Sequence, residues 1–225
     1  MDAEAESVTA ARSVLRQVQD AALARSVLAA MPEWIASGSP PPVAELWEAG
    51  FRHDDTRDPD AWMVRAAFHR RWGYSIPGAE AVAALLALGP MVEVGAGTGY
   101  WSALLHAAGA DIVATDPTSQ GDVGYGFQAG AHHRVEDTDA ITAAARWPER
   151  AIFCSWPTRD DDWAADMAAG LAPGRKMALI VEPANGRTAT PRLYDILRTD
   201  YRPLRMIALP QFPTYRDALL LVERA

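Results

Sequence analysis

The stretch MVEVGAGTGYW, residues 91–101, limits what this chain can fold into more than any other part of the sequence. A short apolar run leads into alternating glycines, and a helix is predicted to follow over residues 101–108. A second apolar run, residues 111–116, ends in an acid. These pieces form a β-loop-α-β unit, so we expect two parallel strands joined by a right-handed crossover.

The glycine loop suits a nucleotide-like ligand. Glycines between a strand and a helix let the backbone approach a ligand closely, and the helix N-terminus offers N–H groups. Asp116, which ends the second strand, can accept hydrogen bonds from both hydroxyls of a ribose. A dinucleotide fingerprint has its third glycine at the sixth position, where this chain has Tyr100, and no Lys-Ser or Lys-Thr pair makes a Walker A loop. A glycine-rich turn in some other α/β fold is the alternative interpretation.

With Glu93 two residues ahead of Gly95, the loop resembles motif I of class I S-adenosylmethionine-dependent methyltransferases. The resemblance extends over residues 74–225 and implies an α/β fold, a Rossmann-like seven-stranded sheet with helices on both faces. In that fold the last two strands form a hairpin, with strand seven inserted antiparallel. LRMIAL and ALLLVE, residues 204–209 and 218–223, stand where this hairpin is expected. The succession of EVGAGTGYW, a strand that ends in Asp116 and a strand that ends in Trp156–Pro157 is similar to a set of bacterial methyltransferase-like proteins.

The other elements predicted for this core alternate between helix and strand. Helices are predicted over residues 79–88, 138–145, 163–171 and 190–199, and strands over residues 133–135, 151–156 and 177–182.

The resemblance implies S-adenosyl-L-methionine as the cofactor and no metal. Asp116 is then the expected ribose ligand, and Asp137 is favoured over Glu136 and Asp139 as the acid that meets adenine. These acids could instead cap the following helix, with Asp137 or Thr138 as the N-cap. The predicted cofactor-binding residues are Tyr74, Glu93, Gly95, Gly97, Gly99, Tyr100, Asp116, Asp137 and Trp156.

The general base is the least determined part of the site. A hydroxyl acceptor benefits from a base, most often His or a carboxylate. We name His133, beside a glycine-rich stretch, and Glu182, at the end of a predicted strand, as the candidate catalytic residues. Either could instead have no part in catalysis, His133 as a surface residue and Glu182 as a helix or loop cap.

Net charge and cysteine content limit the partners and the cellular compartment that we expect for this protein. The net charge of −8 disfavours nucleic acid as a partner. A single cysteine, Cys154, excludes an intrachain disulfide framework, and neither a secretory signal nor a membrane-spanning apolar run is present. We therefore expect a cytoplasmic protein with no membrane partner. Abundant Ala and Arg with Lys176 as the only lysine suggest a bacterial source.

Residues 1–73 are predicted to form an α-helical N-terminal segment, interrupted by the linker SGSPPP at residues 37–42. We expect this segment to cover the acceptor pocket, and its aromatic residues could instead make a homodimer surface. The expected function is methylation of a small molecule, with oxygen favoured over nitrogen as the acceptor atom. A peptide or protein methyltransferase, and a protein of this fold that binds cofactor without transferring methyl, are the alternatives.

Overall fold

The computed structural model describes residue 69 and residues 72–117, 131–182, 187–209 and 215–225. The expected helices and linker of residues 1–68 lie outside the described residues. The domain boundary at residue 73 and the homodimer therefore stay predictions. Trp72, just before that boundary, is 2% exposed and belongs to the core of the α/β unit.

Seven strands form one mixed sheet among the described residues. Its order is β3-β2-β1-β4-β5-β7-β6, with β1 to β5 parallel and β7 antiparallel between β5 and β6. This confirms the expected hairpin with an inserted antiparallel strand. The strands are β1 Met91–Val94, β2 Ile112–Asp116, β3 Val135–Asp137, β4 Ala151–Ser155, β5 Lys176–Val181, β6 Tyr201–Ala208 and β7 Ala218–Arg224.

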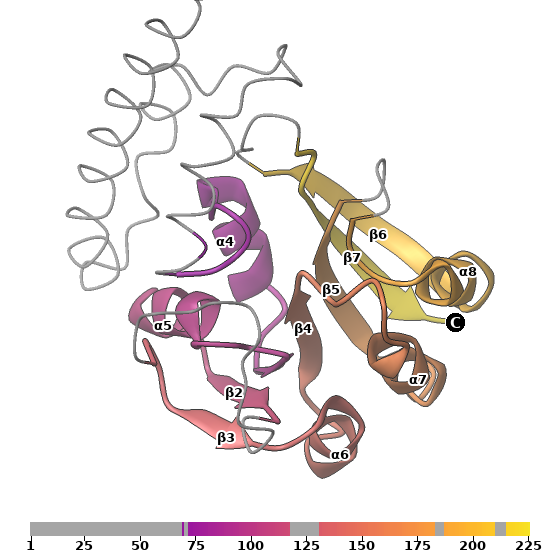
Figure 1. Ribbon diagram of the computed structural model, residues 1–225, viewed down its shortest axis with the longest axis horizontal. Helices are drawn as coiled ribbons and strands as arrows, with labels where there is room; N and C mark the ends of the chain where they lie inside the picture. Colours follow the sequence, from indigo (N-terminus) through magenta and orange to yellow (C-terminus); the bar gives the residue numbers. More distant parts are fainter. Residues whose placement is uncertain (1–68, 70–71, 118–130, 183–186, 210–214) are drawn as a thin grey trace, which may run out of the picture.

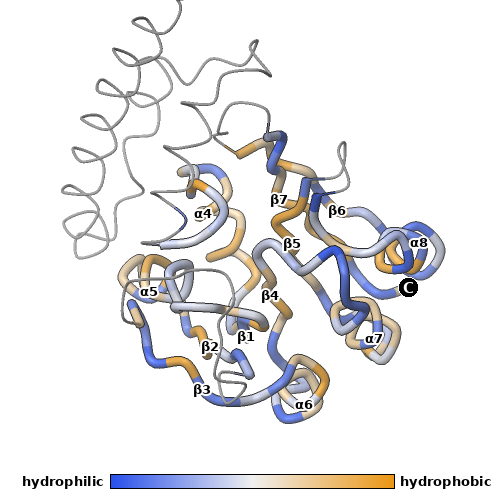
Figure 2. The backbone as a smooth tube through the Cα atoms, viewed as in Figure 1, coloured by the Kyte–Doolittle hydropathy of each residue, from blue (hydrophilic) through white to orange (hydrophobic). Residues whose placement is uncertain are grey.

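Helices cover both faces of this sheet (Figure 1). One face carries α4 Ala79–Leu86 and α5 Tyr100–Ala107, and the other carries α6 Ala140–Arg146, α7 Trp163–Ala169 and α8 Pro191–Asp200. The central strands β4 and β5 are mostly apolar, while much of α8 is hydrophilic (Figure 2). The apolar strand runs are therefore explained by burial on both sides, as in other sheets of parallel strands.

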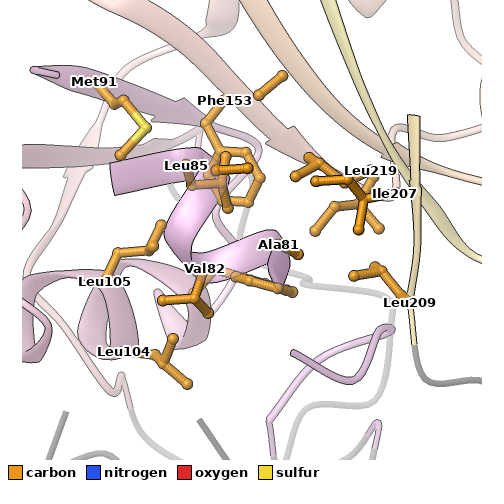
Figure 3. Close-up of a cluster of buried hydrophobic side chains, with 14 of the residues drawn as sticks. Ala81, Val82, Leu85, Met91, Leu104, Leu105, Phe153, Ile207, Leu209 and Leu219 are labelled. Atoms are coloured by element: carbon orange, nitrogen blue, oxygen red, sulfur yellow. The ribbon is translucent and has the colours of Figure 1, made fainter. Parts of the chain in front are cut away.

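The core on the α4 and α5 face joins distant parts of the chain. Val82 and Leu85 of α4 lie in one buried cluster with Phe153 of β4 and Leu219 of β7 (Figure 3). Burying an apolar side chain of this size contributes about 1.5–3 kcal/mol, so this packing fixes the sheet against the helices. The loop between β1 and α5 thus stands on a rigid support.

Two predictions about local structure were wrong. The N-cap of α6 is Asp139, whose carboxylate accepts from the backbone N–H of Thr142, rather than Asp137 or Thr138. The reason is that β3 continues to Asp137, so the helix starts later. β6 begins at Tyr201, three residues before the predicted start, because Tyr201 pairs with Arg224; a register irregularity accommodates Pro203.

Every helix in the described ranges is too short or too polar to cross a bilayer.

Candidate functional site

The loop between β1 and α5 needs all three of its glycines for conformational reasons. Gly95, Gly97 and Gly99 have φ values of 65°, 54° and 74°, in the left-handed region that side chains disfavour. Space is restricted as well. A Cβ on Gly95 would lie 3.0 Å from the indole of Trp163, and a Cβ on Gly99 would lie 2.9 Å from Cβ of His133.

Backbone hydrogen bonds attach this loop to the neighbouring strand. The N–H of Gly97 donates to Oδ2 of Asp116 over 2.8 Å, and the N–H of Ala96 donates to the carbonyl of Thr115 over 3.0 Å. Burial raises the pKa of Asp116, the bond from Gly97 lowers it, and the charge of Asp137 raises it. The carboxylate of Asp116 is therefore oriented beside the loop, at the carboxyl end of β2.

Glu93 lies under the loop rather than on its surface. It is 1% exposed, and Ser102 donates to its carboxylate through both the hydroxyl, at 2.5 Å, and the backbone N–H. Ser102 occupies the first turn of α5, where backbone N–H groups have no partner within the helix. Burial raises the pKa of Glu93 to about 8, the bonds from Ser102 lower it, and Asp116 raises it. Glu93 thus ties β1 to α5.

The three acids proposed for adenine have different surroundings. Glu136 forms an ion pair with Arg146 at 3.0 Å, and Asp139 caps α6. Asp137 stands opposite Asp116 in the register of β2 and β3 and acts on the pKa of Asp116. Asp137 is thus the one of the three acids that stands opposite Asp116, at the ends of β2 and β3.

The residues before α4 also contact the loop. Thr98 donates from its hydroxyl to the carbonyl of Trp72 over 3.0 Å, and the indole of Trp101 donates to Ser75. Tyr100 begins α5, and its side chain is 2% exposed in the core. The side chain of Tyr100 is therefore part of the core under the loop.

An aromatic cluster formed by His69, Tyr74, Trp156 and Tyr215 lies at the carboxyl end of β4. The rings of Tyr74 and Trp156 are nearly parallel, at 8°, with centroids 5.1 Å apart, and Tyr215 is 5.8 Å from Trp156. Trp156 has φ of 61°, a costly conformation for a large side chain. Its indole N–H donates to Asp217 over 3.0 Å, which helps to hold that conformation.

Glu182 and Asp217 are two buried acids beside this cluster. Val181 and Ala218 are the last pair in the register of β5 and β7. Glu182 follows Val181 and Asp217 precedes Ala218, so the two acids stand opposite each other. The carboxylate of Glu182 accepts from the backbone N–H of Arg216 over 3.0 Å and lies 3.6 Å from the guanidinium of Arg187. The candidate base Glu182 is thus a fully buried group held by cationic and backbone partners.

His133, the other candidate base, lies in a different place. The backbone nitrogen and Cβ of His133 lie next to Gly99. The ring of His133 lies 5.3 Å from that of His106, in the last turn of α5. Burial and His106 both lower the pKa of His133. It precedes β3, four strands from β5, a separation of about 19 Å at the usual strand spacing. The structure therefore does not bring His133 and Glu182 together.

The loop and the aromatic cluster follow two neighbouring strands at the same edge of the sheet. β1 and β4 are neighbours in the sheet, and the helices that follow them, α5 and α7, lie on opposite faces. Ligands of open α/β sheets bind at such a switch point, outside the carboxyl ends of the strands.

No protein-family model and no curated protein matches the chain. Among solved structures, it is similar to TrmN from Thermus thermophilus, with a TM-score of 0.45 and 18% identity over 65% of this chain. The match spans about half of TrmN, 48% of its length. It is also similar to magnesium protoporphyrin IX methyltransferase (ChlM) from Synechocystis PCC 6803 with bound SAM, at a TM-score of 0.45 and 16% identity, covering 81% of this chain and 91% of that one.

A third similar structure is the CcbJ methyltransferase from Streptomyces caelestis, with a TM-score of 0.41 and 14% identity over 65% of this chain and 93% of that one. The strand order, with its inserted antiparallel β7, defines the fold. It is the class I methyltransferase fold.

Sequence reasoning missed three residues that shape this methyltransferase-fold site: Ser102, Trp163 and Asp217. Ser102 stands in the first turn of a helix that follows a strand acid, a pattern that could have indicated a cap. Asp217 is a polar residue directly before an apolar strand, which is a weaker signal. Nothing in the sequence indicated that Trp163 would cover Gly95.

Proposed function

We propose that this protein is an S-adenosylmethionine-dependent methyltransferase that acts on a small molecule, with oxygen favoured over nitrogen as the acceptor atom. The observation that carries the proposal is the loop Gly95–Gly97–Gly99 with its left-handed backbone and its hydrogen bond to Asp116. This loop stands at the β1–β4 switch point of a methyltransferase-type sheet. The residues therefore fit a nucleoside cofactor with a flexible amino-acid end.

Each residue of the loop region has a role in this proposal. The glycines bring the backbone close to the amino-acid end of the cofactor, Asp116 accepts from the ribose hydroxyls, and Asp137 lies next to Asp116 for adenine. The bond from Gly97 fixes Asp116 before the ligand arrives, which lowers the cost of ordering it on binding. When bound, the cofactor supplies a methyl group on a sulfonium, which a nucleophile can attack in line.

The aromatic cluster and the buried acids supply the other wall of the proposed site. Trp156 and Tyr74 present large apolar side chains at the end of β4, which suits a water-poor pocket for an organic acceptor. The acids Asp116 and Asp137 at the neighbouring ends of β2 and β3 disfavour a phosphate backbone. These features support a small molecule over a nucleic acid, and His133 and Glu182 stay proposals for the base.

Two experiments test the proposal. S-adenosylhomocysteine should raise the melting temperature of the full-length protein, whereas NAD and ATP should not; a ligand at 100 times its Kd stabilises by about 2.7 kcal/mol. Radiolabelled methyl transfer to panels of phenols, carboxylic acids, amines and peptides then identifies the acceptor class. Transfer to peptides alone would overturn the small-molecule proposal, and cofactor binding with no transfer to any panel would favour a binding role.

A further inference from the structure

The indole of Trp163, the first residue of α7, lies against the first glycine of the loop. A Cβ on Gly95 would be 3.0 Å from Cη2 and 3.4 Å from Cζ2 of this ring, closer than an ordinary contact between carbon atoms. The benzene edge of the indole therefore covers the Cα of Gly95. Because Gly95 has φ of 65°, the ring packs on a left-handed stretch of backbone.

The loop is held in different ways on its two sides. Toward β2, the backbone N–H groups of Ala96 and Gly97 donate hydrogen bonds to the end of that strand. Toward β4, the register with β1 ends at Glu93, two residues before Gly95. On this side the contact comes from Trp163, on the helix that follows β4. Glycine has more backbone conformations open to it than any other residue, so the shape of the loop at Gly95 depends on what packs there.

Trp163 is held in place by groups outside the loop. Its indole N–H donates to the hydroxyl of Thr158 over 2.7 Å, and its backbone N–H donates to Asp161 over 3.1 Å. The ring also packs against the buried cluster on the α6 to α8 face, which includes Val94 of β1. The position of the indole is thus set by the β4–α7 connection and by the core.

We propose that Trp163 is a positioning residue for the cofactor: its indole keeps Gly95 in the left-handed conformation, so that the loop is formed before the ligand arrives, and Thr158 keeps the indole in place. Without the ring, Gly95 samples other conformations, and only the molecules with a formed loop bind. The observed Kd then rises in inverse proportion to the formed fraction, by the same factor for every ligand that needs the loop.

This inference rests on the proposed function and deepens it, because it assigns control of the loop's shape to a residue outside the loop. A merely structural Trp163 would change the stability of the protein and leave the affinity of the folded molecules unchanged. Affinity and stability are therefore measured separately in each variant.

The first test compares wild type with Trp163→Leu, which removes the ring over Gly95 and keeps an apolar side chain. Calorimetric titration with S-adenosylhomocysteine should give an affinity about tenfold lower, as expected if about a tenth of the molecules keep a formed loop. Trp147→Leu is the matched control, because Trp147 is also partly buried against the same cluster but lies between α6 and β4. It should bind like wild type, and urea denaturation checks that both variants are folded.

A second ligand separates positioning from direct contact. 5′-Methylthioadenosine has the adenosine part of the cofactor and lacks its amino-acid end. If Trp163 acts through the shape of the loop, Trp163→Leu should weaken both ligands by the same factor. A loss confined to S-adenosylhomocysteine would mean that the indole touches the amino-acid end itself, and would overturn the positioning role.

The anchor of the indole gives an independent readout, which also serves if Trp163→Leu does not fold. Thr158→Val keeps the shape of the side chain and removes the acceptor of the indole N–H. It should weaken S-adenosylhomocysteine by about threefold in wild type and have no effect in Trp163→Phe, which has no N–H to donate. Equal losses in the two backgrounds, or no loss in either, would overturn the inference.

The outcomes separate the two proposals. Wild-type affinity for S-adenosylhomocysteine in a folded Trp163→Leu would overturn the inference and leave the proposed function intact. Failure of wild type to bind S-adenosylhomocysteine would instead overturn the proposed function.

Discussion

At the ends of β1 and β2, the candidate site consists mainly of backbone; at the ends of β4, β5 and β7, it consists of side chains from distant parts of the sequence. The loop half contains Gly95, Gly97 and Gly99, with Asp116 held by a backbone N–H. The aromatic half depends on contacts such as Trp156 to Asp217, 61 positions apart. The half that is built from a local turn tolerates little change in that turn. The half that is built from side-chain contacts can lose those contacts one at a time.

The largest expected effect comes from the loop half. Gly99→Ala combines a left-handed backbone, which costs about 1–2 kcal/mol, with overpacking against His133, which costs about 1–3 kcal/mol more. Gly109→Ala is the matched control at the other end of α5: its φ is 93°, but its Cβ would meet nothing within 4 Å. Urea denaturation should show the larger loss for Gly99→Ala. Equal losses would mean that the close packing of the loop is unimportant.

Removing the carboxylate of Asp116 tests the loop half at a side chain, and it also removes the acceptor of the Gly97 N–H. Asp116→Ala loses charge-assisted hydrogen bonds to the ribose, each worth roughly 1.5–3 kcal/mol. The affinity for S-adenosylhomocysteine, measured by calorimetry, should fall by at least about tenfold. Asp111→Ala, just before the other end of β2 and paired with Arg150, is the control and should bind normally. Normal binding by Asp116→Ala would show that the ribose lies elsewhere.

The pH dependence of stability tests the burial of Glu93. Its pKa is raised from the ordinary 4.5 to about 8, so the folded state holds a proton that the unfolded state has lost between these values. The free energy of unfolding should therefore fall with rising pH in this window, by up to about 1.4 kcal/mol per unit. Glu93→Gln should lack this contribution. Its free energy of unfolding should therefore fall less than that of wild type as the pH rises to 9. Parallel stability curves for the two proteins would contradict the burial of an acid here.

The smallest expected effect lies in the aromatic half. Trp156→Phe keeps a ring against Tyr74 but removes the N–H donated to Asp217. The cost should be about 1 kcal/mol, the lower end of what it costs to leave a buried acceptor without a donor, because the new ring keeps the contact with Tyr74. A double-mutant cycle with Asp217→Ala, followed by thermal unfolding, measures the coupling. Additive losses would indicate that the two residues do not depend on each other.

The contrast between the halves also explains what the sequence could predict. The strands and the loop followed from apolar runs and glycine spacing, which are local patterns with a direct backbone cause, whereas the antiparallel insertion of the last strand was implied by the family resemblance. The placement of Asp116 beside the loop followed from parallel pairing of β1 and β2. These features need no knowledge of distant contacts.

Features that depend on distant contacts were not predicted. The start of β6 at Tyr201 depends on pairing with Arg224, and the cover of Gly95 depends on Trp163 from another βα unit. We named His133 as a candidate base for its residue type, yet its ring lies beside that of His106. Sequence alone also gave Glu93 no particular protonation state, because that state arises from its burial under α5.

The central claim is that the loop half binds an S-adenosyl cofactor, and calorimetric titration of the full-length protein with S-adenosylhomocysteine tests it most directly. We expect saturable one-to-one binding that Asp116→Ala weakens by at least about tenfold, with no binding of NAD under the same conditions. No heat of binding at millimolar ligand by a folded protein, or equal binding of NAD, would contradict the account.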